Sequence, residues 1–422
     1  MSQDQADVIV LGAGLVGVAT AYYLAQHGRR VMVVEQREGA GLGTSYANGG
    51  LMTPSMSDPW AAPGLPLKLL KWMGDEQSPF LLRARAIPGL FGWGLEFLRN
   101  CAPARWRANA RIIYQLSHYS QQTTAALTRA TGIAYDRSSK GTLRIFGDAL
   151  SMQNAQRGAE MVGEFGCRYQ AMTPAECIQV EPALAQALGR FSGGIHFPDD
   201  ESGDAHRFTR ALAEYCQGQG VVFRHGVTVQ SLAASGGALT GLHTDQGRLS
   251  ARAYVLALGV MSPMLARPLG IQLPIYPVKG YSATVSVQGW NGAPTVPVVD
   301  DGRKMAITRL GDRLRLAGTA EFNGYDTTAN PRRGAMLIHS LNELFPGCVQ
   351  AHSAEHWTGL RPMTPDGIPY LGKTPYANLY LNTGQGHLGY TQACGSGKLV
   401  ADLITGHHPE IDISGLGLDR HR

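Results

Sequence analysis

The chain has 422 residues, more than one compact core ordinarily holds, and this length predicts two domains. Its formal net charge of +5 is small and comes from no run of Lys or Arg, so the composition gives little support to nucleic-acid binding. The six Cys residues lack the spacing of a metal site or a disulfide framework. A reduced, cytoplasmic protein without a structural metal is therefore expected.

The longest uncharged stretch, Val8 to Ala25, resembles a membrane helix or a signal peptide in its hydropathy. We reject both interpretations, because acidic rather than basic residues precede the stretch and three Gly residues interrupt it. No other stretch is long and apolar enough to span a bilayer. The mild positive charge is compatible with weak attraction to an anionic membrane surface.

Residues 7–35 carry the strongest local signal. An apolar strand runs into Gly12, Gly14 and Gly17, a helix follows, and a second apolar strand ends at Glu35. This order is typical of a dinucleotide-binding βαβ unit, with the pyrophosphate at the helix N-terminus and the acid on a ribose. The alternative is an ordinary βαβ unit with an accidental glycine pattern. The predicted contacts are Gly12, Ala13, Gly14, Leu15, Val16, Gly17, Glu35 and Gln36.

Residues 39–50 are too rich in Gly and small polar side chains to form a regular element. We expect a loop that lies against the ligand, in which Thr44 and Ser45 can hydrogen-bond phosphate oxygens. A flexible surface loop is the alternative. The predicted contacts from this segment are Thr44, Ser45, Asn48, Gly49, Gly50 and Leu51.

Apolar residues near a period of 3.6 predict helices over 68–73, 90–100 and 108–131. Most of their large side chains are expected in the core, and a minority could form an exposed face for a membrane or an electron-acceptor partner. Strands are predicted over 142–146 and 194–197, with a helix over 152–164 between them.

The second half of the chain is predicted to return to the nucleotide domain before and after an antiparallel sheet. A helix over 208–217 precedes strands over 221–229 and 253–259, which place Val227 near the adenine end and Gly259 near the cofactor backbone. Two ordinary strands of the same sheet are the alternative. Alternation over 274–301 and 305–319 predicts antiparallel strands. A loop over 356–367, a strand over 379–383 and a final helix that ends at Gly406 complete the chain.

Several motifs together resemble the FAD-dependent D-amino acid oxidase and glycine oxidase family. They are the N-terminal glycine motif with Glu35, the Gly280 region, Gly359-Leu-Arg-Pro362 with Asp366-Gly367, and Gly384-Gln-Gly-His-Leu-Gly389. Within the family, bacterial members that dehydrogenate D-amino acids are most similar, over segments such as 277–282, 357–367 and 393–397. The resemblance covers nearly the whole chain.

The resemblance implies an α/β fold with noncovalently bound FAD on a Rossmann-like domain, formed by residues 1–55, 200–270 and 350–422. It also implies an α+β substrate domain on a mixed, largely antiparallel sheet, formed by 56–199 and 271–349 with a helical insertion at about 60–131. Relatives that bind flavin covalently use a Cys near the loop from Arg361 to Asp366, where this chain has Met363. Reversible binding is therefore expected.

In the family, the Arg of the Leu-Arg-Pro motif binds the substrate carboxylate, and here that residue is Arg361. A guanidinium can hold a carboxylate at two points and so orient the substrate. The alternative is a structural Arg that pairs with an internal acid such as Asp366. Tyr281 is a weaker candidate for a second contact with substrate.

The start of the last helix is expected to face the flavin N1–C2=O edge, where its dipole would stabilise negative charge. Backbone groups of Gly386, His387, Leu388 and Gly389 would supply this contact. The His387 side chain could either line the pocket or satisfy a hydrogen bond of the loop.

The resemblance implies oxidative deamination of a D-amino acid by hydride transfer from Cα to flavin N5, with electrons passed to a membrane quinone or another respiratory acceptor. An oxygen-dependent oxidase of glycine, sarcosine or hydroxyproline is the alternative, and a flavin-binding tRNA-modification module is less favoured. A cytoplasmic location follows, and peripheral attachment to the inner membrane stays open. The residues indicate neither the preferred substrate side chain nor the oligomeric state.

Overall fold

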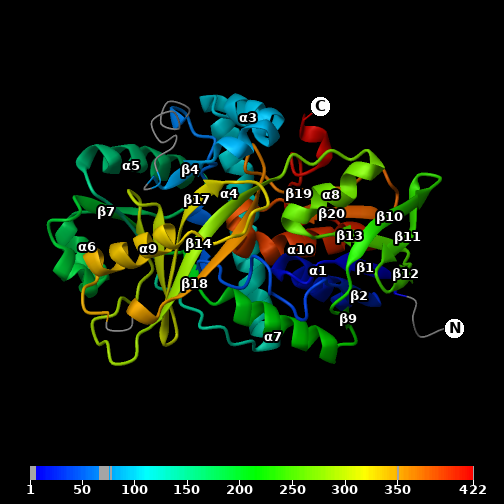
Figure 1. Ribbon diagram of the computed structural model, residues 1–422, viewed down its shortest axis with the longest axis horizontal. Helices are drawn as coiled ribbons and strands as arrows, with labels where there is room; N and C mark the ends of the chain where they lie inside the picture. Colours follow the sequence, from blue (N-terminus) through cyan, green and yellow to red (C-terminus); the bar gives the residue numbers. More distant parts are fainter. Residues whose placement is uncertain (1–5, 66–75, 77, 349–350, 422) are drawn as a thin grey trace.

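The computed structural model describes residues 6–65, 76, 78–348 and 351–421, and it contains two large sheets that lie side by side (Figure 1). The first sheet has six strands in the order β19-β20-β13-β1-β2-β9. All neighbours in it run parallel except β19 and β20. These strands are β1 (Val8–Leu11), β2 (Val31–Val34), β9 (Val222–Arg224), β13 (Ala253–Leu256), β19 (Tyr370–Lys373) and β20 (Leu379–Thr383).

Helices cover one face of the six-stranded sheet, and a small sheet covers the other. The covering helices are α1 (Leu15–Gln26), α4 (Pro103–Thr131), α7 (Ala205–Gly218) and α10 (Gly389–Thr405). On the opposite face lie β10 (Val229–Ser235), β11 (Ala238–Thr244), β12 (Gly247–Leu249) and α8 (Ser262–Ala266).

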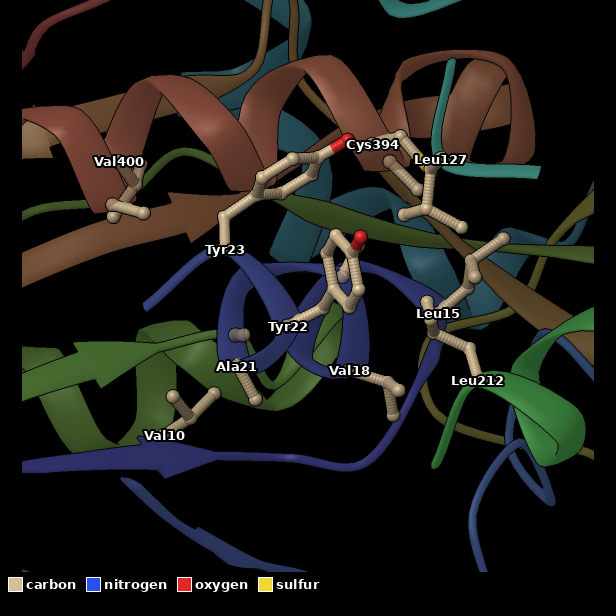
Figure 2. Close-up of a cluster of buried hydrophobic side chains, with 14 of the residues drawn as sticks. Val10, Leu15, Val18, Ala21, Tyr22, Tyr23, Leu127, Leu212, Cys394 and Val400 are labelled. Atoms are coloured by element: carbon tan, nitrogen blue, oxygen red, sulfur yellow. The ribbon is translucent and has the colours of Figure 1, made fainter. Parts of the chain in front are cut away.

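The helix α1 is apolar on almost every side because other elements surround it. Figure 2 shows Leu212 of α7, Leu127 of α4 and Val400 of α10 grouped around it. A helix that is hydrophobic all round is stable only when it is buried in this way. The uncharged stretch at the N-terminus is therefore the centre of a protein core.

The second sheet has nine strands in the order β18-β14-β17-β16-β15-β5-β7-β6, with β4 paired to β17. It is mixed and mostly antiparallel, with parallel pairs β15–β5 and β17–β4. Its strands are β4 (Phe80–Leu82), β5 (Thr142–Phe146), β6 (Gln170–Met172), β7 (Gly193–Phe197), β14 (Tyr276–Ser286), β15 (Val298–Asp300), β16 (Met305–Leu310), β17 (Arg313–Phe322) and β18 (Glu355–Met363).

Three further helices flank the nine-stranded sheet, and a short two-stranded sheet completes the fold. The helices are α5 (Ala149–Gly163), α6 (Pro174–Val180) and α9 (Pro331–Leu344). The two-stranded sheet pairs β3 (Leu51–Met52) with β8 (Glu201–Ser202). The helix α3 (Ile87–Asn100) lies at the top of the molecule in Figure 1.

Most predicted elements are confirmed, and a few differ from the structure. The loop predicted over 356–367 is wrong for its first part, because β18 pairs with β14 along its whole length. Consequently the segment 350–422 contributes strands to both large sheets.

The helix α9 and the β10–β12 sheet had no predicted counterpart. The helix predicted over 68–73 lies outside the described residues. No helix in the described part of the chain is long and apolar enough to cross a membrane.

Candidate active site

The glycines of the N-terminal motif meet the steric demands of a tight strand-to-helix turn. Gly12 has a φ of +105°, and a Cβ there would lie 2.7 Å from the carbonyl oxygen of Ala257. A Cβ on Gly17 would lie 2.0 Å from the carbonyl oxygen of Gly12. Both positions therefore exclude any side chain, as close packing of α1 on β1 requires.

Gly14 differs because the space beside its Cα is open. A Cβ there would meet only Ser45 Oγ, at 3.9 Å, and the N-cap residue, Gly14, has no side chain of its own to cap α1. The Ser45 hydroxyl accepts from the N–H of Leu15 at 3.2 Å and can donate its own proton to a phosphate oxygen. A helix N-terminus beside an open glycine fits a pyrophosphate, and Gly14, Leu15, Val16 and Ser45 lie together there.

Glu35 lies at the end of β2, where its carboxylate accepts from Ala13 N at 2.8 Å and from Arg37 N at 3.0 Å. Val227 donates its N–H to the Glu35 carbonyl at 2.9 Å and is thereby held beside it. The Gln36 side chain is exposed. The structure thus brings Glu35, Gln36 and Val227 together at the end of β2.

The loop after β2 connects the two sheets. Thr44 Oγ1 donates to the carbonyl oxygen of Leu360 in β18 at 3.0 Å, and Arg315 of β17 donates to the carbonyl oxygen of Asn48 at 2.9 Å. A Cβ on Gly49 would lie 3.2 Å from Ala317 Cβ, so this loop lies directly on the nine-stranded sheet. Gly50 and Leu51 continue from the loop into β3. Contacts with the nine-stranded sheet therefore hold the loop over residues 39–50 in place.

Arg361 of β18 folds over a glycine of the neighbouring strand. A Cβ on Gly280 would lie 2.4 Å from both Cζ and Nη1 of Arg361, so only glycine leaves room for the guanidinium. Nη1 donates to the carbonyl oxygen of Thr319 at 3.0 Å. Among the described residues, no carboxylate lies within ion-pair distance of Arg361. Burial lowers the pKa of Arg361 to about 10, so the side chain stays charged at neutral pH.

The alternative role of Arg361, as a structural partner of Asp366, is wrong. Asp366 pairs with Arg420, whose Nε lies 2.8 Å from Asp366 Oδ2, and both side chains are buried. Arg361 is therefore a half-buried cation without a carboxylate counterion among the described residues.

Thr319 is a strained residue next to this guanidinium. Its φ of +56° is rare for a β-branched side chain, and the β14–β17 pairing shifts register at this point. The irregularity turns the Thr319 carbonyl toward Arg361. The hydroxyls of Thr319 and Ser282 are buried and have no hydrogen-bond partner among the described residues. Unpartnered buried hydroxyls on a sheet face fit a polar ligand.

Tyr281 does not join Arg361. In β14 the residue follows Gly280, so the strand's alternation directs its side chain to the opposite face of the sheet. There its hydroxyl donates to Glu321 Oε2 at 2.5 Å, and the ring packs in the hydrophobic core. Burial first, and then the Glu321 hydrogen bond, raise the pKa of Tyr281. The predicted substrate contact from Tyr281 is therefore wrong.

The residues before α10 lie next to Arg361 because Met363 and Gln385 form an isolated β-bridge. The segment Gly386–Leu388 forms a single 3₁₀ turn, and Gly389 begins α10. His387 stacks on Trp60 and donates a long hydrogen bond, 3.4 Å, to the carbonyl oxygen of Met56. Burial, together with the nearby Arg361 charge, lowers the pKa of His387 to about 4. The hydrogen bond to the loop is therefore present, and the His387 ring is neutral at neutral pH near the Arg361 charge.

Gly259 lies beside β18 from the side of the first sheet. It has a φ of +54°, and a Cβ there would lie 3.9 Å from Pro362 Cγ. The residue is therefore at the junction of the two sheets, close to the motif that carries Arg361.

The sequence did not identify the apolar wall above Arg361. Trp93 and Phe97 of α3 pack against Tyr276, Val278 and Met363, and Trp93 Nε1 donates to the Met363 carbonyl at 2.9 Å. The helical spacing of the apolar residues predicted that these aromatic side chains are buried, but it did not indicate which part of the protein they pack against. Thr319 carried no local signal, because its strain arises from strand pairing.

One group outside the site resembles a metal site. His27, Asp402 and His407 have ligand atoms within 4.8 Å of one another. However, the ammonium of Lys398 lies 3.3 Å from Asp402 Oδ2, and His27 Nε2 lies 2.9 Å from Oδ1. The carboxylate already has cationic and hydrogen-bonding partners, so the group joins α1 to α10 as a polar cluster.

Comparison with known proteins agrees with this geometry. The D-amino acid dehydrogenase of Paramagnetospirillum magneticum is 50% identical over 414 residues, which cover 98% of each chain. The D-amino acid dehydrogenase of Methylobacterium nodulans is 49% identical over 97% of this chain and 98% of its own.

Solved structures share the fold. Glycine oxidase from Geobacillus kaustophilus has a TM-score of 0.76 at 24% identity, with all of both chains covered. L-proline dehydrogenase from P. horikoshii has a TM-score of 0.76 at 18% identity, over 100% of this chain and 98% of its own. The model of the FAD-dependent oxidoreductase family matches residues 7–403. The chain therefore belongs to the FAD-dependent oxidoreductase family.

Proposed function

We propose that the protein oxidatively deaminates D-amino acids to 2-oxo acids and ammonia. The observation that carries the proposal is the charged Arg361 guanidinium, which has no carboxylate partner among the described residues and lies across Gly280. An α-carboxylate is the ligand that a guanidinium binds at two points. The names of the relatives that are about half identical support D-amino acids as the substrate class.

The protein's own contribution is to bind, orient and shield the substrate. Arg361, held by the Thr319 carbonyl, would fix the carboxylate and hence the direction of the Cα–H bond. Trp93 and Phe97 would exclude water from the apolar side. FAD, when bound, supplies the acceptor for the hydride. The imino acid would then hydrolyse in water.

No side-chain base is assigned. His387 lies beside Arg361, but a pKa of about 4 makes it a weak base at neutral pH. The substrate would therefore react as its neutral amine. A His387→Leu variant is expected to keep the same pH dependence of kcat/KM between pH 6 and 9. Loss of an ionisation in that range would assign His387 a proton-transfer role.

The six-stranded sheet would bind FAD, and the nine-stranded sheet would bind substrate. Gly14, Glu35 and Ser45 would hold the pyrophosphate and ribose, and the turn at Gly386–Leu388 would face the flavin. Binding would be noncovalent, because Met363 occupies the place of the flavin-linking Cys. Acid precipitation should then release all of the flavin into the supernatant.

The electrons would pass to a quinone or another respiratory-chain acceptor, with the protein attached peripherally to the inner membrane. A dehydrogenase and an oxidase differ here in a measurable way. Under air, D-alanine should reduce a quinone analogue or dye with little peroxide. Peroxide in equal yield to the 2-oxo acid would favour the oxidase.

The direct test is anaerobic mixing of the FAD-loaded protein with a panel of amino acids. D-alanine and other D-amino acids should bleach the oxidised flavin absorbance, whereas their L-enantiomers should not. Bleaching by L-amino acids, glycine or N-methylglycine alone would overturn the proposal.

A further inference from the structure

The helix α3 presents an unusual apolar stripe to solvent. Ile87, Phe91, Leu95 and Leu98 are 51%, 80%, 45% and 50% exposed. Their spacing of three and four residues places them on one face of the helix. In the described part of the chain, nine large apolar side chains are exposed, and four of them are in this one helix. A concentrated stripe of this kind marks an interaction surface.

The positive charge of the protein is concentrated around the same helix. Residues 80–111 contain six Arg and one acid, Glu96. The whole chain has 37 Lys and Arg against 32 Asp and Glu, so its entire excess of five positive charges equals the excess of this segment. The remainder of the chain is electrically balanced.

Part of this positive charge is available to a partner. Four of the six Arg are paired: Arg83 with Glu76 and Glu321, Arg85 with Asp326, Arg99 with Glu96 and Arg107 with Glu164. Arg105 and Arg111 are exposed in the first three turns of α4, which is separated from the end of α3 by two residues, and neither has an ion-pair partner among the described residues. Exposed apolar residues bordered by unpaired Arg are typical of a helix that lies in the interface of an anionic bilayer.

The opposite side of α3 packs against residues near the candidate active site. Trp93 and Phe97 are buried, and Trp93 donates to the carbonyl oxygen of Met363, two residues after Arg361. The exposed stripe and the wall of the substrate site therefore belong to one helix. A surface in contact with the stripe would lie directly over this wall.

We propose that the α3 stripe, together with Arg105 and Arg111, docks the protein on the surface of an anionic phospholipid bilayer. The proposal extends the proposed function, on which it rests for the membrane location of the electron acceptor. Phe91 and its neighbours would enter the boundary between headgroups and acyl chains, and the arginines would contact lipid phosphates. A bilayer fits better than an acidic protein because the most exposed side chain, Phe91, protrudes from the helix.

The test is sedimentation of the FAD-loaded protein with vesicles of phosphatidylcholine and phosphatidylglycerol, compared with vesicles of phosphatidylcholine alone. The unmodified protein should bind the anionic vesicles and release as salt is raised. A Phe91→Ser/Leu95→Ser variant should bind roughly tenfold more weakly or worse. An Arg105→Gln/Arg111→Gln variant should lose most of its preference for anionic vesicles.

A matched control is Leu150→Ser, because Leu150 is 67% exposed but lies on α5 and is outside the stripe. This variant should bind vesicles like the unmodified protein. All variants should keep dye reduction by D-alanine in solution, which measures the proposed function without membranes. Vesicle binding without dye reduction would refute the function but keep the docking surface.

Two results would overturn the docking proposal. One is equal vesicle binding by the Phe91→Ser/Leu95→Ser variant, or no binding by the unmodified protein. The other is a dimer in analytical ultracentrifugation that the same variant converts to monomers without any vesicle binding. That result would assign the stripe to a second copy of the chain.

Discussion

The two proposed binding regions of the protein are built in opposite ways. Around α1, one continuous stretch of chain supplies the strand, the turn and the helix N-terminus, and Glu35 follows directly after the next strand. Around Arg361, three strands meet that are separated by long stretches of sequence: β14 brings Gly280, β17 brings Thr319 and β18 brings Arg361.

The two regions therefore differ in the contacts on which ligand binding would depend. The proposed cofactor region depends on close backbone packing, because a Cβ on Gly17 would clash with the carbonyl oxygen of Gly12. The substrate region depends on a side chain that needs an empty position on a neighbouring strand, because Arg361 lies across Gly280. The following substitutions test this contrast.

The largest effect is expected for Arg361→Gln. Losing the charged carboxylate contact should lower kcat/KM for D-alanine by about 10³-fold. Flavin content and Tm should stay near their original values, because no described acid depends on Arg361. Steady-state dye reduction and thermal unfolding measure both quantities.

Arg420→Gln serves as the control for this substitution. It removes the ion pair between Arg420 and the buried Asp366 carboxylate and should reduce the free energy of unfolding by about 3 kcal/mol. If Arg361→Gln instead unfolds the protein while Arg420→Gln does not, the two arginines have the opposite roles.

Gly17→Ala should damage the cofactor region. The new Cβ would lie 2.0 Å from a backbone oxygen, so α1 must shift from β1, at a cost of about 3 kcal/mol in stability. FAD retained after purification should fall in parallel. Gly218→Ala, at the end of α7 and with no atom outside the neighbouring helix backbone within 4 Å, should lower neither value. Normal flavin content in Gly17→Ala would contradict the steric argument.

Gly280→Ala should affect substrate rather than cofactor. The methyl group would occupy the place of the guanidinium and raise KM by roughly 10- to 100-fold, with flavin content unchanged. In the Arg361→Gln background the same substitution should have no further effect on kcat/KM, because its target is gone. Full additivity of the two losses would show that Gly280 acts independently of Arg361.

The smallest effect is expected for Thr319→Gly. Glycine tolerates the φ of +56°, so the free energy of unfolding should rise by about 1 kcal/mol. The carbonyl that holds Arg361 becomes less constrained, so KM should rise a few-fold. A fall in Tm would indicate that the Thr319 side chain stabilises the fold more than its backbone strain costs.

Sequence patterns alone predict the parts of this protein that depend on local geometry. The order of strand, glycines, helix and acid over residues 8–35 predicted the cofactor region, because a tight turn and a close helix impose their own residue types. Periodicity predicted α4, β5 and α10 for the same reason. The Leu-Arg-Pro resemblance identified Arg361, although as part of a loop.

The residues that surround Arg361 follow from strand pairing in the folded chain and from no local sequence pattern. Strand pairing turned Tyr281 away, placed Gly280 under the guanidinium and strained Thr319, and it assigned Asp366 to Arg420. Pairing between strands far apart in sequence depends on register, and a shift of one residue reverses every side chain. No local pattern contains that register, so the substrate region became visible only in the folded chain.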